Sequence, residues 1–172
     1  DRVADLGFEA FEFWGSEGKD LEKVKEKAVD NKLNLAATTG LSSVLTVPEK
    51  TEAAVNNLRK SIKICQQINS TNLIVTTGQE QENLSRNQQH NNIVEILNRV
   101  KNDAEKAEVK LVLEPLNIAV NHAGYYLYSS YEGYEILEKV NSPYVKLLFD
   151  VYHQQITEGN IIQNIRDNID YI

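Results

Sequence analysis

Two patterns of hydrophobic and polar positions alternate along the chain. Short apolar runs, rich in β-branched and aromatic residues, lack helical spacing and predict strands. We expect these strands at 8–14, 34–38, 73–75, 111–113 and 145–149. The longer segments between them repeat apolar residues every three or four positions, which is typical of helices with one buried face. The chain therefore alternates strand and helix about five times, which favours a parallel sheet covered by helices.

Residues with helix-terminal preferences indicate where the helices begin and end. Segment 1–7 is typical of a helix end closed by glycine, and 162–169 repeats isoleucine at helical spacing. The expected first residues or caps of the other helices are Asp20, Pro48, Ser85, and Ser129 paired with Glu132 in a capping box.

Two architectures are compatible with this alternation. A doubly wound sheet would be complete at 172 residues, whereas a (β/α)₈ barrel needs about 250. No glycine-rich nucleotide signature follows any predicted strand, which weakens the doubly wound alternative. The sequence contains no methionine, so we expect it to be a piece of a longer protein, and a truncated barrel is then easier to accept. No linker divides it, so residues 1–172 are predicted to form one domain.

Composition excludes several classes of protein. Hydrophobic residues make up 41% of the chain and charged residues 25%, as in ordinary globular domains. The net charge of −7 disfavours nucleic acid as a partner, and no apolar run has the length of a membrane helix. Cys65 is the single cysteine and falls on a predicted helix face, so we expect a buried thiol and a cytoplasmic protein. The oligomeric state stays open, and a homo-oligomer is one option.

Two predicted strands each end on a carboxylate. The run 111–113 leads into Glu114, and the run 145–149 leads into Asp150. The interval between the two acids suits one strand–helix unit, so both would stand at the carboxyl edge of one parallel sheet, on neighbouring strands. Such edges carry the chemistry of α/β proteins. Two adjacent carboxylates with no obvious cationic partner predict a site for one divalent metal ion.

Further candidate residues surround this predicted edge. His153 lies three positions after Asp150, and we expect a neutral imidazole that donates a hydrogen bond to a substrate oxygen. His122 lies on the loop after the strand of Glu114, above the same edge, and is a second candidate for substrate contact. Trp14, at the end of the first strand, is predicted either to wall the pocket or to pack at its rim. His90 is expected to be solvated.

Several segments resemble the hydroxypyruvate isomerase family, which belongs to the xylose-isomerase-like barrels. They include Leu-Glu-Pro-Leu-Asn at 113–117 and His-Ala-Gly-Tyr-Tyr-Leu at 122–127. The most specific stretch is 146–160, with Phe-Asp-Val-Tyr-His-Gln-Gln inside it, and the similarity extends over essentially the whole chain.

The resemblance implies a partial (β/α)₈ TIM barrel of about five to six βα units, with its first strand and its last two βα units outside this chain. It also implies one Mg²⁺ or Mn²⁺ ion at the mouth, with Glu114 and Asp150 as two of its four ligands and Glu114 also transferring protons. The implied reaction interconverts hydroxypyruvate and 2-hydroxy-3-oxopropanoate through an enediolate. His153, His122 and Trp14 would contact the substrate, a small hydroxy-oxo acid or sugar.

Other interpretations are also compatible with the sequence. Ketose 3-epimerases with the same barrel typically carry an acid six positions after the first Glu, where this chain has Val120. Endonuclease-type barrels need several histidines and a basic face, whereas this chain has three histidines and an acidic balance. A piece that lacks two metal ligands could also bind metal weakly and catalyse nothing.

Overall fold

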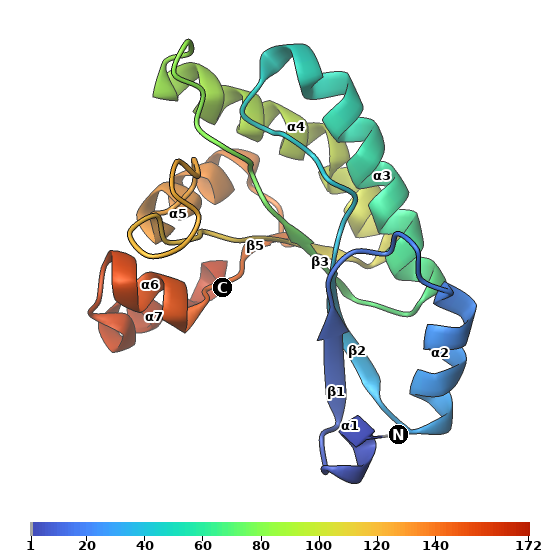
Figure 1. Ribbon diagram of the computed structural model, residues 1–172. Helices are drawn as coiled ribbons and strands as arrows, with labels where there is room; N and C mark the ends of the chain where they lie inside the picture. Colours follow the sequence, from blue (N-terminus) through green and yellow to red (C-terminus); the bar gives the residue numbers. More distant parts are fainter. Residues whose placement is uncertain (1) are drawn as a thin grey trace.

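One parallel five-stranded sheet organises the molecule. The structure is a computed structural model that describes residues 2–172, and Figure 1 shows its elements. Each strand pairs in parallel with its neighbours in sequence, in the order β1-β2-β3-β4-β5. The strands are β1 (Ala10–Phe13), β2 (Asn34–Thr39), β3 (Asn72–Val75), β4 (Lys110–Leu113) and β5 (Val145–Leu147). All five expected strands are present, and β1 and β5 are shorter than expected.

Helices alternate with these strands, and short helices stand at both ends of the chain. They are α1 (Arg2–Asp5), α2 (Leu21–Asp30), η1 (Pro48–Lys50), α3 (Thr51–Gln67), α4 (Arg86–Ala107), α5 (Ser130–Val140), α6 (Val151–Thr157), α7 (Ile161–Asn168) and η2 (Ile169–Tyr171). The short helix α6, directly after Asp150, was not expected, because no apolar periodicity marks it.

The order of the strands decides between the two architectures. A doubly wound sheet reverses its strand order at a switch point, whereas this sheet keeps the sequence order from one edge to the other. Helices α2, α3, α4 and α5 pack on β2, β3, β4 and β5 respectively, and Figure 1 shows α2, α3 and α4 spread around the strands. The described part of the chain is therefore the larger part of an α/β barrel, as predicted.

The core lies between the strands and the apolar faces of α3, α4 and α5. Cys65 on α3 is fully buried, and burial raises the pKa of its thiol to about 12. The expected buried thiol is thus present. Helix α5 approaches β5 so closely that a Cβ on Gly133 would lie 2.5 Å from Leu147 Cδ1, so any larger residue there would force the Leu147 side chain to move.

The helix caps follow the sequence prediction at two places and depart from it at a third. The Asp20 side chain accepts a hydrogen bond from the Lys23 N–H at 3.1 Å, and Ser85 forms a full capping box with Gln88. The box predicted between Ser129 and Glu132 is wrong, because Ser129 makes no side-chain cap.

The start of α5 is instead satisfied by a carboxylate from elsewhere in the chain. Glu158 accepts hydrogen bonds from the Ser129 hydroxyl, the Ser130 N–H and the Ser130 hydroxyl at 2.6–2.8 Å. It also accepts one from the Asn164 amide at 3.0 Å. A carboxylate at a helix N-terminus is electrostatically favourable, so Glu158 fixes the segment after β5 against α5.

Within residues 2–172, no helix combines the length and apolarity that crossing a bilayer requires.

Candidate active site at the carboxyl ends of the strands

Glu114 is the first residue after β4, and local bonds fix its position. Its N–H donates to the Val75 carbonyl at 3.0 Å, which continues the β3–β4 ladder by one bond. Pro115 disfavours helical backbone at Glu114. The Tyr125 hydroxyl accepts from the Thr77 N–H at 2.7 Å and donates to the Glu114 carbonyl at 3.4 Å. The carboxylate therefore projects from a fixed backbone.

Asp150 stands at the corresponding end of β5, where the chain turns into α6. Its Oδ1 accepts a hydrogen bond from the His153 N–H at 3.0 Å, so Asp150 is the N-cap of α6. This capping bond uses one carboxylate oxygen and fixes the orientation of the other. The helix-cap role and a metal-ligand role are therefore compatible in the same side chain.

The two carboxylates meet, as their places in the sequence predict. Glu114, Asp150 and His153 each offer a ligand-type atom, and these atoms lie within 4.8 Å of one another. Within the described chain, no Lys or Arg forms an ion pair with either acid. This spacing allows one cation to contact both carboxylates.

Electrostatics at Glu114 reflect burial and crowding by like charges. Burial, the charge of Asp150 and the charge of Glu12 raise the pKa of Glu114 from 4.5 to about 7. A carboxyl surrounded by acids and by little water holds its proton more tightly. A divalent cation would relieve the same repulsion, so the electrostatic environment suits a bound cation.

These residues line one cavity of about 790 Å³. Trp14 and His122 also line it, and the Trp14 side chain is 79% exposed, which places it at the rim rather than in an inner wall. The His122 ring centroid is 5.5 Å from that of His153. The structure thus brings all five predicted site residues to one cavity, while their chemical roles stay predictions.

His153 is buried against the loop that follows β4. Burial lowers the pKa of its imidazole, and the neighbouring Asp150 charge opposes this effect. A neutral ring at neutral pH agrees with the donor role expected for it.

His90, by contrast, is not solvated as expected. It is 6% exposed, because α5 covers it: the Lys139 ammonium lies 2.8 Å from its Nε2, and a Glu132 oxygen lies 3.5 Å from its Nδ1.

Three residues of this region were not found by sequence reasoning. Glu12 and Lys19 line the cavity, and Asn117 contacts the His153 ring. The alternation along β1 could have indicated Glu12, since Phe11 and Phe13 flank it. Lys19 and Asn117 carry no such signal, because each reaches the site through the path of a loop.

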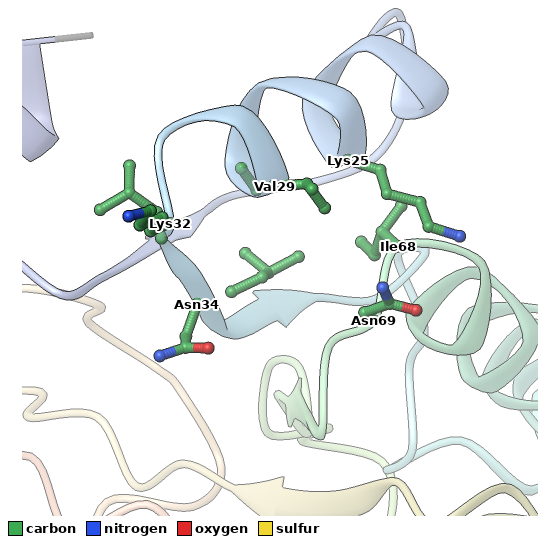
Figure 2. A pocket seen from close by; sticks show the side chains of 9 residues that line it. Lys25, Val29, Lys32, Asn34, Ile68 and Asn69 are labelled. Carbon is green, nitrogen blue, oxygen red and sulfur yellow. The ribbon is translucent and has the colours of Figure 1, made fainter.

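A second hollow, shown in Figure 2, lies at the opposite end of the sheet. It measures about 380 Å³ and is lined by α2, the start of β2 and the turn after α3. Lys25, Lys32, Asn34 and Asn69 are its polar residues, and its lining contains no carboxylate, histidine or cysteine. It therefore offers none of the ligands or acid–base groups found at the other end.

Fold and site together define a barrel-type protein with a carboxylate centre at its mouth. A family model described as xylose isomerase-like TIM barrel matches residues 1–172, and the chain belongs to this family. The chain is 24% identical over 180 residues to hydroxypyruvate isomerase of Escherichia coli (strain K12), covering 100% of this chain and 69% of that protein. The resemblance seen in the sequence is thereby confirmed.

Solved structures agree on the fold. A structure of AP endonuclease, family 2, from Brucella melitensis superposes with a TM-score of 0.91 at 19% identity, covering 97% of this chain and 67% of that one. The IOLI protein with a bound zinc atom gives 0.84 at 17% identity, covering 99% and 63%. This chain thus spans about two thirds of the length of these proteins.

Proposed function

We propose that the gene product containing this chain is a metal-dependent isomerase that interconverts hydroxypyruvate and 2-hydroxy-3-oxopropanoate. One observation carries the proposal: Glu114 and Asp150, unpaired with any cationic side chain of residues 2–172, meet at the strand ends inside one cavity. The similarity to an E. coli hydroxypyruvate isomerase supports the choice of reaction. The lone buried Cys65 supports a reducing compartment, which we take to be the cytoplasm.

The donor set fits a hard divalent cation. Glu114 and Asp150 would hold it through carboxylate oxygens, the ligands that Mg²⁺ and Mn²⁺ prefer. A bound ion of this kind supplies Lewis-acid stabilisation of the negative charge that develops on the substrate oxygens. Further ligands, and the second proton-transferring acid, are assigned to the part of the barrel after Ile172.

The residues of this chain supply proton transfer and orientation. The reaction removes a proton from the hydroxymethyl carbon of hydroxypyruvate and returns one to the neighbouring carbonyl carbon, and the hydroxyl proton moves between the two oxygens. No oxidant or reductant is consumed. We assign proton transfer to Glu114. Its pKa is about 7 without a cation, and a bound cation would lower that pKa. His153 and His122 donate hydrogen bonds to substrate oxygens, and Trp14 covers the entrance.

Lys19 favours an acidic substrate over a neutral sugar. It is the one Lys or Arg among the described residues that line the cavity, which otherwise presents the acids Glu12, Glu17, Glu114 and Asp150. Its ammonium donates to the Trp14 and Gly15 carbonyls at 2.8 Å, which leaves one N–H for another acceptor. A substrate carboxylate would satisfy that donor.

The alternatives within the family are a related sugar isomerase or epimerase, and a piece with no activity of its own. Val120 stands where a ketose 3-epimerase with this barrel would carry its extra acid, and the valine side chain cannot transfer a proton. A 172-residue chain without further ligands would bind metal weakly, and the assay must therefore use the complete reading frame.

The test is an isomerase assay on the product of that complete reading frame, loaded with Mg²⁺ or Mn²⁺. We expect conversion of hydroxypyruvate that requires the metal, with little conversion of ketoses. Glu114→Gln should retain the fold and lose turnover. If this variant turns over at a near-normal rate with metal bound, Glu114 does not transfer the proton. If the parent protein converts only sugars, the substrate assignment is wrong.

A further inference from the structure

The contacts of Asn117 determine which nitrogen of His153 carries a proton. The His153 Nδ1 lies 2.8 Å from the Asn117 side-chain nitrogen and 3.2 Å from the Asn117 backbone nitrogen. Asn117 is fully buried and His153 is 9% exposed. Two nitrogens of one residue therefore converge on one ring nitrogen, away from bulk water.

The orientation of the Asn117 amide is fixed independently of the histidine. Its Oδ1 accepts hydrogen bonds from the Val120 N–H at 3.0 Å and from the Asn121 N–H at 3.1 Å. Backbone N–H groups only donate, so the atom they contact must be the amide oxygen. The atom that faces His153 is consequently the NH₂ group, which only donates.

A ring nitrogen that receives donated hydrogen bonds carries a lone pair and no proton. In a neutral imidazole, the proton then lies on the other nitrogen. His153 is therefore the Nε2–H tautomer. The Nδ1 lone pair is taken by Asn117 and the Nε2 position is covered by its proton, so neither nitrogen is open to a cation.

We propose that Asn117 is a positioning residue that holds His153 in the Nε2–H tautomer, so that His153 presents a hydrogen-bond donor to the substrate and leaves the cation to Glu114 and Asp150. The tautomer follows from the contacts alone, and only the donation to substrate depends on the proposed function. Asn117 also organises the backbone at 120–121, just before His122, so one amide links both histidines of the cavity.

The decisive variant is Asn117→Asp, which has the same shape. The aspartate keeps an acceptor for the Val120 and Asn121 N–H groups and places a carboxylate oxygen where the NH₂ donor stood. The Asn117 backbone N–H still faces Nδ1 at 3.2 Å, but the carboxylate holds the shorter contact, so we expect it to draw the proton onto Nδ1. The matched control is Asn121→Asp, the same chemical change four residues further on. The Asn121 side chain accepts from the Tyr152 hydroxyl.

The measurement is long-range ¹H–¹⁵N correlation NMR of protein with ¹⁵N-labelled histidine at neutral pH. The sample is the complete gene product, and the three histidines of residues 1–172 are assigned with single His→Gln variants. We expect wild-type His153 to be protonated at Nε2 and bare at Nδ1, before and after titration with Mg²⁺. Asn117→Asp should show a protonated Nδ1, and Asn121→Asp should match the wild type.

Any other NMR result contradicts the proposal. A wild-type ring protonated at Nδ1 overturns it even if no variant folds, and so does loss of the Nε2 proton on Mg²⁺ binding. An unchanged pattern in Asn117→Asp shows that Asn117 does not control the tautomer.

In the complete gene product, Asn117→Asp should lower kcat about 10- to 100-fold, the usual cost of losing an outer partner of a site residue. If the wild type has no isomerase activity but shows the Nε2–H tautomer, the proposed function fails and the role of Asn117 stands.

Discussion

Replacing Glu114 by Gln should stabilise the protein at pH 8 when divalent ions are absent. The folded state holds the pKa of this carboxyl at about 7, above its ordinary value of 4.5. Folded protein therefore binds more protons than unfolded protein between these pH values, and its free energy of unfolding falls as pH rises through that window. Above pH 7 the free energy of unfolding has fallen by the full amount, since Glu114 is then ionised beside Asp150 and Glu12.

The difference between the two pKa values sets the size of the effect. At about 1.4 kcal/mol per pH unit, it gives an upper limit of about 3 kcal/mol. The carboxyl is partly exposed, and solvent screening reduces this figure, so we expect Glu114→Gln to gain about 1–2 kcal/mol at pH 8. At pH 4.5 the variant and the wild type should be almost equally stable, because Glu114 is then protonated in the folded state.

Urea unfolding followed by circular dichroism measures this difference, with a chelator present. Glu105→Gln, an exposed position on α4 away from the cavity, is the control for loss of a surface charge. With saturating Mn²⁺ the order should reverse, because an ion bound only by the folded wild type stabilises it. If Glu114→Gln is no more stable than the wild type in chelator at pH 8, the argument from burial and like charge is wrong.

Two substitutions and one labelling experiment test other parts of the structure. Lys19→Met should raise KM for hydroxypyruvate about 10- to 100-fold, the value of one charge-assisted hydrogen bond, and should change kcat little. An unchanged KM in steady-state assays would show that Lys19 does not bind the substrate. Glu158→Gln weakens the cap of α5 and should lower the free energy of unfolding by about 2–4 kcal/mol in urea titration, and a loss below about 0.5 kcal/mol would show that this contact adds little. Cys65 should resist a thiol reagent at pH 8 in the folded state and react in urea, because it is buried and its pKa is about 12; rapid reaction of native protein would contradict its placement in the core.

Parts of the fold and site that depend on local pattern could be predicted from the sequence. Strand β4 contains the apolar run 111–113 followed by Glu-Pro, and β5 ends at Leu147, with only Leu148 before Phe149-Asp150. Neighbouring parallel strands bring their carboxyl ends together independently of the conformation of the loops. The proximity of Glu114 and Asp150 could therefore be predicted. Trp14 directly follows β1, and His122 and His153 lie on the segments after β4 and β5, so the same rule placed them near this edge, while their residue types singled them out.

Features that depend on contacts between distant segments could not be predicted. Ser129 and Glu132 have the spacing of a capping box, but the start of α5 is capped by Glu158, which lies after β5 in the sequence and accepts hydrogen bonds from Ser129 and Ser130. Helix α6 is short and has no apolar period, so its start is set by the Asp150 cap. His90 is buried only because Lys139 and Glu132 of α5 lie across it. The tautomer of His153 is set by an amide 36 positions earlier.

The central claim is that Glu114 and Asp150 hold one divalent cation between them. Titration of the complete gene product with Mn²⁺, followed by isothermal calorimetry and by electron paramagnetic resonance of free Mn²⁺, tests it most directly. We predict one ion per chain and at least a tenfold loss of affinity in both Glu114→Gln and Asp150→Asn, with Glu105→Gln unchanged. Equal binding by the wild type and both cavity variants, or no binding by the wild type at millimolar Mn²⁺, would contradict the claim.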